Sequence, residues 1–189
     1  EATKLYEQAL ALSQKSVEAS PTNAILQHDL SVAYDRLGGV LSLAGDLSAA
    51  ADRYQRALAI SQKLAEADAK NSAWQRGLAV CYQRLGGVLQ QGGKLPEAKT
   101  RYEQAAALGE QLVKADPKNS DWKRDLAAYY HMLGDVLRQS GKLAAAKARY
   151  EQAQSLSEKP AAADPEYTEP MHDQLRRAPS RPRHSHALR

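Results

Sequence analysis

The sequence is poor in several residue types, and each shortage excludes a class of protein. Its 189 residues contain one cysteine, Cys81, so no disulfide can form within the chain and no cysteine spacing indicates a zinc site. No apolar run approaches the ~18 residues that a membrane-spanning helix needs. Phenylalanine is absent and β-branched residues are few, whereas alanine and leucine are abundant. This composition favours helices, and the single cysteine fits a reducing compartment, for which we expect the cytoplasm.

The formal net charge of +4 comes from one end of the chain. Residues 171–189 contain five arginines and a single acidic residue, Asp173. The remaining 170 residues carry 21 basic and 21 acidic groups and are therefore neutral overall. A charge-driven function could thus belong to the C-terminal segment but not to the rest of the chain.

Most of the chain repeats itself at a fixed interval. Residues 84–105, RLGGVLQQGGKLPEAKTRYEQA, are a near-copy of residues 36–57 and of residues 132–153. The interval is 48 residues, and it recurs at Tyr6, Tyr54, Tyr102 and Tyr150. A fixed period in this range is typical of a solenoid, in which each unit buries its apolar face only against its neighbours.

Each repeated unit has the pattern of two helices. Apolar residues recur at steps of three and four from Trp74 to Leu89 and again from Leu95 to Leu112. Helix-capping residues mark the ends of both segments: they are Asn71-Ser72, Asn119-Ser120, Gly45, Gly93 and Gly141, with Pro96 in a first turn. The predicted fold is therefore all-α, a stack of antiparallel helix hairpins.

Several positions recur together in a way that resembles the tetratricopeptide repeat family. Residues 1–158 carry its Leu-Gly pair, the aromatic residue three positions earlier, and its spaced alanines and tyrosines, at Tyr82, Leu85-Gly86, Ala98, Tyr102 and Ala105 and at the positions 48 before and after them. WQRGL at 74–78 and WKRDL at 122–126 are similar to the openings of long bacterial repeats of this family. The resemblance implies a right-handed α-α superhelix that acts as a non-enzymatic, cofactor-free protein-interaction scaffold.

The repeats are longer than those of the family. An ordinary unit has about 34 residues, so each unit here carries about 14 more, which divide into about seven in each helix. Because seven residues make almost two helical turns, such an insertion rotates the apolar stripe by only ~20°. Both helices can lengthen and still bury the same faces. We further expect Gly86 and Ala98 to lie where the two helices of a unit approach closely.

The period also divides the chain. We expect a half-unit at residues 1–19 and units at about 24–67, 72–115 and 120–158, in which Pro160 ends the last helix. A degenerate capping segment follows at 159–178, and a flexible basic tail at 179–189. Because the chain begins with Glu1, partway through a repeat, we expect it to be a fragment or a processed product. The apolar stripe of the half-unit (Leu5, Ala9 and Leu12) would then be covered by upstream sequence or by self-association into a homo-oligomer.

The family resemblance also implies where a partner binds. In this family the first helices line a concave groove that holds a segment of another protein. The corresponding positions here are Asp35, Arg36, Gly39, Ser42, Leu43, Gln83, Arg84, Gly87, Gln90, Gln91, His131, Asp135, Arg138 and Gln139. Mixed charges and glutamines suit a peptide held by hydrogen bonds and a few ion pairs, although the same residues would also make an ordinary solvated helix face.

Other chemistry is less well supported. The clamp with which some family members hold acidic chaperone tails needs lysine and asparagine where this chain has residues such as Asp35 and Gly39. His131 and Asp135 are four residues apart on one helix, but two ligands do not make a metal site, and a groove-facing pair is the better reading. Cys81 aligns with an alanine and should be buried. The two tryptophans should pack between repeats.

The arginine-rich C-terminal segment supports an alternative function. Its arginines could bind nucleic acid or an acidic partner through charge; they are Arg176, Arg177, Arg181, Arg183 and Arg189. No aromatic residue lies among them, which disfavours nucleic acid. The segment also holds a P-x-x-P match at 179–182 and two histidines, His184 and His186, which are weak signals for a peptide-binding domain and a metal.

Overall fold

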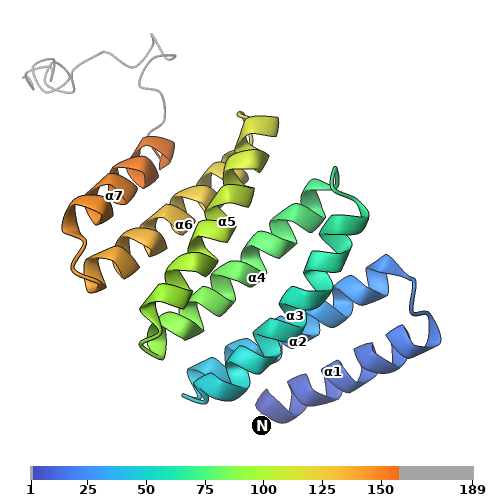
Figure 1. The fold of residues 1–189 in the computed structure, drawn as a ribbon. Coiled ribbons are helices and arrows are strands. Elements are labelled where there is room, and N and C mark those ends of the chain that lie inside the picture. Colours follow the sequence, from blue (N-terminus) through green and yellow to red (C-terminus); the bar gives the residue numbers. More distant parts are fainter. Residues whose placement is uncertain (1, 158–189) are drawn as a thin grey trace, which may run out of the picture. The chain divides into compact units, whose positions relative to one another are not determined.

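The computed structural model describes residues 2–157 and consists there of helices and short connections, without a strand (Figure 1). The described part contains seven helices. They are α1 (Ala2–Ala19), α2 (Ala24–Leu43), α3 (Leu47–Ala67), α4 (Ser72–Gln91), α5 (Leu95–Ala115), α6 (Ser120–Gln139) and α7 (Leu143–Ser157).

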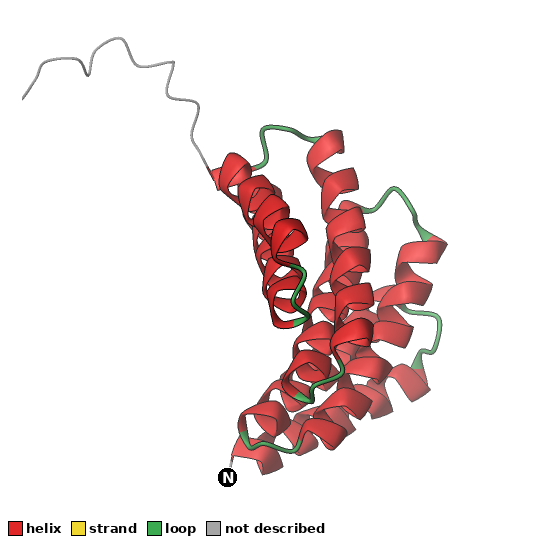
Figure 2. Ribbon diagram, turned by 60° about the vertical axis from the view of Figure 1, so that its left-hand side comes forward, coloured by secondary structure: helices red, strands yellow, loops and turns green. Residues whose placement is uncertain are grey.

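The helices pack in chain order. Helices α2 and α3, α4 and α5, and α6 and α7 form three antiparallel pairs, and each pair also contacts the next through α3–α4 and α5–α6. Helix α1 packs on α2 as the second helix of a pair without its first (Figures 1 and 2). Adjacent helices therefore supply most of the packing, which makes the described part an all-α helical solenoid, as the period predicts.

The helix ends follow the predicted capping chemistry. The side chains of Asn71 and Asn119 accept hydrogen bonds from the backbone N–H groups two and three residues on, and Asn23 does the same for α2. The turn inside each pair contains a glycine with positive φ, 85° at Gly45 and 74° at Gly93. Other residues rarely adopt this conformation, so these glycines allow the sharp reversal between the two helices of a pair.

The core repeats with the sequence. Leu37, Leu85 and Leu133 are each 1% exposed, at equivalent positions of the three first helices. The close approach expected at Gly86 is confirmed: a Cβ atom there would lie 2.8 Å from Cε1 of Tyr102. Gly38 and Gly134 meet Tyr54 and Tyr150 in the same way. The glycine and the tyrosine are thus two halves of one contact, which sets the spacing of the helices within a pair.

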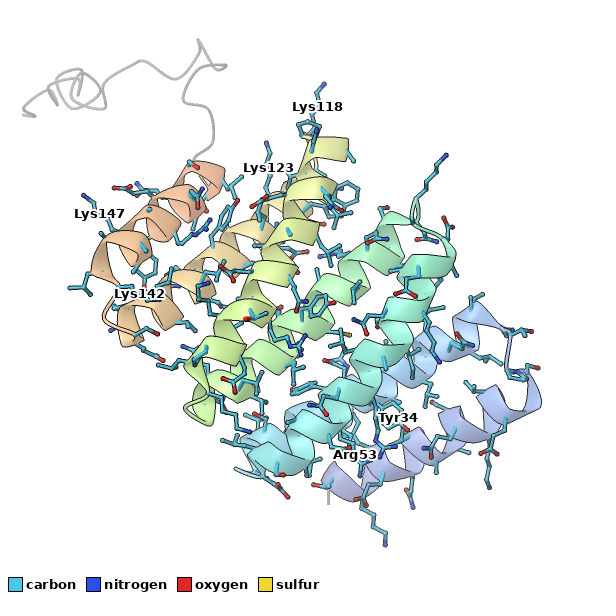
Figure 3. The ribbon with its side chains drawn as sticks, in the orientation of Figure 1. Tyr34, Arg53, Lys118, Lys123, Lys142 and Lys147 are labelled. Carbon is cyan, nitrogen blue, oxygen red and sulfur yellow. The ribbon has the colours of Figure 1, made fainter. Side chains whose placement is uncertain are left out.

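A second set of tyrosines ties each unit to the one before it. The hydroxyl of Tyr34 accepts a hydrogen bond from Gln14 Nε2 at 3.0 Å, and Tyr82 accepts one from Gln62 Nε2 at 3.0 Å. In the third unit the direction reverses, because Tyr130 donates to Glu110 Oε1 at 2.7 Å. Each bond spans 20 residues and joins a first helix to the preceding second helix. Figure 3 shows Tyr34 at the first of these junctions.

The outer side of α1 has no neighbour among the described residues. Leu5 is 63% exposed and Leu12 is 67% exposed, whereas Leu10 is buried against the core. The expectations for the C-terminal segment, namely the helix break at Pro160, the cap at 159–178 and the basic tail, concern residues that lie outside the described part. Within residues 2–157 no helix is both long enough and apolar enough to span a membrane.

Candidate partner-binding face

The first helices of the three units, α2, α4 and α6, are joined directly to one another by polar side chains. Arg84 Nε lies 3.5 Å from Asp35 Oδ1, and Arg76 Nε lies 2.6 Å from Asp125 Oδ2. Ser42 Oγ donates to Gln91 Oε1 at 3.3 Å. In all three pairs the partners are 49 residues apart, which is one period plus one residue. In this register, side chains of one first helix face the side chains 49 residues later on the next first helix.

These helices enclose a hollow of about 660 Å³, which we call the central hollow. It spans the first two junctions of the array, and its walls are both aromatic and basic. The residues that form its walls come from α2, α4 and α6. Residues of α2, α3 and α4 form its floor. The lining residues include His28, Val32, Asp35 and Arg36, then Trp74, Arg76, Gly77, Val80 and Arg84, then Trp122, and on the floor Ser31, Ser61 and Cys81.

Arginines dominate the charge of the central hollow. Arg36, Arg76 and Arg84 line it together with a single carboxylate, that of Asp35. Burial raises the pKa of Asp35 above its ordinary value, and the positive charges of Arg84 and Arg36 oppose that shift. Among the described residues, Asp35 Oδ1 has no hydrogen-bond donor. Asp125, outside the lining, neutralises Arg76, and Asp35 lies beside Arg84. The excess of positive charge beside the apolar wall is therefore that of Arg36.

Other basic side chains lie elsewhere on the array. Lys118, Lys123, Lys142 and Lys147 belong to α6, α7 and the connections before them (Figure 3). None of the four lines the central hollow.

The floor of the central hollow is a small buried polar cluster. Ser31 Oγ and Ser61 Oγ are 2.9 Å apart, and Ser61 Oγ lies 3.3 Å from Cys81 Sγ. Ser31 also donates to the backbone carbonyl of Ala57 at 3.1 Å. Burial raises the pKa of the Cys81 thiol, which keeps it protonated and unreactive at neutral pH. Cys81 is 5% exposed, as its alignment with an alanine predicts.

The predicted groove residues do not gather in one place. Asp35, Arg36 and Arg84 line the central hollow. His131 and Arg138 line a second hollow of about 770 Å³ between α6 and α7.

Four of the other predicted groove residues lie against tyrosines of the second helices. Tyr102 donates to Gln90 Oε1 at 2.9 Å, and Tyr150 donates to Asp135 Oδ1 at 2.8 Å. A Cβ atom at the glycines would lie 3.6 to 3.7 Å from a tyrosine hydroxyl. These residues are Gln90, Asp135, Gly39 and Gly87. Ser42 and Gln91 bond to each other, and Gln83 and Gln139 line neither hollow.

His131 and Asp135 do form a pair, with 3.5 Å between His131 Nδ1 and Asp135 Oδ2. The imidazole also lies edge-on to the ring of Tyr150, 5.1 Å between centroids. Within residues 2–157 no group of three or more histidine, cysteine or carboxylate side chains is placed to hold a metal ion.

Sequence reasoning missed the residues that form the aromatic and apolar walls. Trp74 makes the inter-repeat contact expected of it, since its ring is 5.0 Å from that of His28 on α2, but it also lines the central hollow. Trp122, Val32 and Gly77 line it too. The sequence did contain a signal for these residues. WQRGL and WKRDL lie at the starts of α4 and α6, in the turns by which these repeats exceed the ordinary length.

Comparison with known proteins gives two matches to family models, both described as tetratricopeptide repeat, at residues 78–117 and 127–160. A crystal structure of MamA aligns with 18% identity and a TM-score of 0.47, covering 80% of this chain and 88% of that one. A structure described as "MamA MSR-1 C2" aligns with 20% identity and a TM-score of 0.45, covering 82% and 69%. The crystal structure of BtubC (BKLC) from P. vanneervenii has 13% identity and a TM-score of 0.29, covering 99% and 96%.

No curated protein matches the sequence. The two family matches fall on the second and third of the 48-residue units and include the glycine–tyrosine contacts of α4–α5 and α6–α7. The chain therefore contains tetratricopeptide repeats, at residues 78–117 and 127–160.

Proposed function

We propose that this protein is a scaffold that binds a segment of another protein at the central hollow, on the face made by α2, α4 and α6. Tetratricopeptide repeats support a protein-interaction role in general. The observation that carries the finer proposal is the hollow itself, which is lined by Trp74, Trp122 and three arginines. Tryptophan and arginine are the side chains most enriched among residues that dominate binding energy at interfaces.

The mechanism is passive. The first helices are held by their own caps, by the glycine–tyrosine contacts and by the ion pairs between units, so the face exists before a partner arrives. Binding of a partner segment therefore does not include the entropy cost of ordering the array, because the array is already folded. Of the groove residues predicted from the family, Asp35, Arg36 and Arg84 are then the ones best placed to contact the partner.

The remaining predicted positions would contribute at the edges of this face. His131 and Arg138 border the second hollow, where a longer partner segment could continue. Gln90 and Asp135 are engaged by tyrosine hydroxyls, so contact with a partner there would compete with a bond that already exists. We therefore propose the central hollow as the main site.

A peptide-display selection tests the proposal. Twelve-residue random peptides are selected against the whole chain, and the most enriched peptide is synthesised for titration. Trp74 and Trp122 are the two tryptophans of the sequence and both line the hollow, so their emission reports occupancy directly. We expect the peptide to change this emission and to lose affinity at least tenfold for Val32→Glu, which places a negative charge in the apolar wall of the hollow, beside its arginines.

The matched control is Leu12→Glu, on the exposed side of α1 and outside the hollow, which should bind as the unmodified chain does. If no peptide is enriched, or if Val32→Glu binds as well as Leu12→Glu does, the central hollow is not the binding site.

A further inference from the structure

Gly77 lines the central hollow at a position where neither the backbone conformation nor the packing requires a glycine. Gly77 lies in the second turn of α4, well inside a 20-residue helix. Glycine is the least favourable non-proline residue at such a position. Its φ is not positive, and a Cβ atom built on it would meet nothing within 4 Å. Gly86, in the same helix, is different, because a Cβ there would lie 2.8 Å from the ring of Tyr102.

The equivalent positions in the neighbouring units show what Gly77 replaces. They are Asp29 and Asp125, 48 residues away on either side. Asp125 pairs with Arg76 of the preceding first helix at 2.6 Å, in the 49-residue register described above. The same register sets His28 opposite Gly77, where no acidic side chain exists to make the bond. His28 instead packs its ring 5.0 Å from that of Trp74.

The presence of glycine at position 77, where the neighbouring units have aspartate, has two consequences. It removes the side chain that would bridge α2 and α4, which leaves open space at Gly77 in a hollow that Val32, Trp74, Val80 and Trp122 also line. It also leaves the hollow without a negative charge that the neighbouring units carry at this position. Arg76 and Arg84 have carboxylate partners, but Arg36, on the exposed side of α2, has none within 4 Å among the described residues.

We propose that Gly77 lines a socket for one bulky apolar side chain of the partner, and that acidic residues next to this anchor pair with Arg36, which has no carboxylate partner among the described residues. The occupant is thus an acidic peptide segment of another protein with a single large aliphatic or aromatic anchor. Indole and valine walls favour such an anchor through burial of apolar surface. The excess of arginine gives the flanking positions their preference for carboxylates. This inference rests on the proposed function, of which it specifies the ligand.

Three results follow for the peptides selected above. The enriched sequences should carry more acidic than basic residues around one large apolar position. Replacing that position by alanine in the synthetic peptide should lower its affinity at least tenfold. Replacing the flanking acidic residues by lysine should abolish the change in tryptophan emission at the concentrations that saturate the original peptide.

The variant Gly77→Ala separates a binding role from a structural one. Alanine is the better helix former, so the melting temperature should rise by about 2–4 °C. The added methyl group enters the socket, and affinity for the selected peptide should fall at least tenfold. The variant Gly77→Asp restores the residue of the neighbouring units and should weaken binding of the acidic peptide further. The control Gly92→Ala, at the exposed end of α4, should leave affinity unchanged.

The outcomes distinguish the two levels of the proposal. If Val32→Glu abolishes binding but Gly77→Ala does not, the peptide occupies the hollow and the socket is wrong. Enrichment of basic peptides, or of peptides without a large apolar residue, also overturns the socket while leaving the hollow as the site. If Val32→Glu has no effect, the proposed function fails and the socket fails with it.

Discussion

Glycines serve two opposite purposes in α4. Gly86 lets the ring of Tyr102 approach the helix axis, so its missing side chain is filled by a neighbour. Gly77 leaves a space that no neighbour fills. The first kind of glycine is needed for packing, and the second lowers helix stability without a packing benefit. Residues that break a local rule with no structural compensation are where a functional role is best sought.

The packing role of Gly86 can be measured against the adjacent glycine. Gly86→Ala and Gly87→Ala gain the same helix propensity, so their difference isolates the contact with Tyr102. A Cβ atom at 86 would lie 2.8 Å from the ring, whereas one at 87 would lie 3.7 Å from the hydroxyl. We expect Gly86→Ala to be less stable than Gly87→Ala by about 1–3 kcal/mol in urea unfolding. Equal stabilities would show that the ring moves aside without cost.

The buried phenol of Tyr102 makes a second prediction, for stability at high pH. Burial and the negative charge of Asp135 raise the pKa of Tyr102 to about 12. In the unfolded chain the phenol ionises near its ordinary value of about 10. The stability contributed by the neutral phenol is therefore complete below pH ~10 and is lost as the pH rises towards the folded-state pKa.

Between pH ~10 and ~12 the free energy of unfolding should fall more steeply in the unmodified chain than in Tyr102→Phe. The difference in slope is at most about 1.4 kcal/mol per pH unit. Losing the hydrogen bond to Gln90 shifts the whole curve of the variant by about 1 kcal/mol but does not change its slope. Tyr6→Phe, at an exposed ring of α1, serves as the control in the same urea titrations. If the free energy of unfolding fell equally steeply with pH in Tyr102→Phe and in the unmodified chain, the raised pKa of Tyr102 would be contradicted.

At the scale of the helix, each first helix starts with the same cap, whereas the second helices do not share one. Asn71 Oδ1 accepts hydrogen bonds from the backbone N–H groups of Ala73 and Trp74 at 3.1 and 3.2 Å. Lys94, at the start of α5, makes no side-chain capping bond. The asparagine fixes the first turn of α4, and that turn carries Trp74 into the central hollow.

Asn71→Ala should therefore destabilise the array by about 1 kcal/mol, which lowers the melting temperature by about 2–4 °C for a chain of this size. The matched control is Lys94→Ala, which removes a side chain from the corresponding position of α5 without removing a capping bond. Circular dichroism melts of the two variants provide the comparison. A loss of the same size in both would mean that the side-chain cap contributes nothing to α4.

The helices were predictable from the sequence because their signals are local. Asparagine before an apolar stripe, and glycine after it, each act within a few residues, and the 48-residue period shows each signal three times. The contact of Gly86 with the second helix followed from the same alignment. Periodicity assigns a residue to a face of a helix, and for the core that is sufficient.

The candidate site was harder to predict, for a geometric reason. Gln90 and Asp135 lie on the predicted face, but tyrosines of the second helices reach across and occupy them. The hollow forms about three turns earlier, around Gly77. Along these helices the side chains that meet are 49 residues apart rather than 48. The extra residue in this register depends on how each unit is rotated relative to the next. The sequence pattern within one unit does not determine that rotation. The groove positions of a 34-residue repeat also do not cover turns that such a repeat lacks.

At the scale of the array, stability is shared between neighbours along a line. Leu37, Leu85 and Leu133 are equivalent residues of α2, α4 and α6, and each is 1% exposed. In a compact domain with a single core, the same substitution at any of them would destabilise the whole. In a solenoid each unit gains stability from its own packing and from the adjacent units alone. The position of the substitution along the array should then decide which part unfolds.

Each leucine-to-alanine change costs about 2–5 kcal/mol locally, but the consequences should differ between the central and the outer units. Leu85→Ala weakens the unit that couples the other two, so urea unfolding should broaden and its apparent m-value should fall. Leu133→Ala should increase hydrogen exchange in α6 and α7 while the amides of α2 and α3 stay protected, and Leu37→Ala should do the reverse. Exchange that rises uniformly over residues 2–157 in all three variants would mean that the helices share one cooperative core, and the first-helix face could not then be treated as a set of separable units.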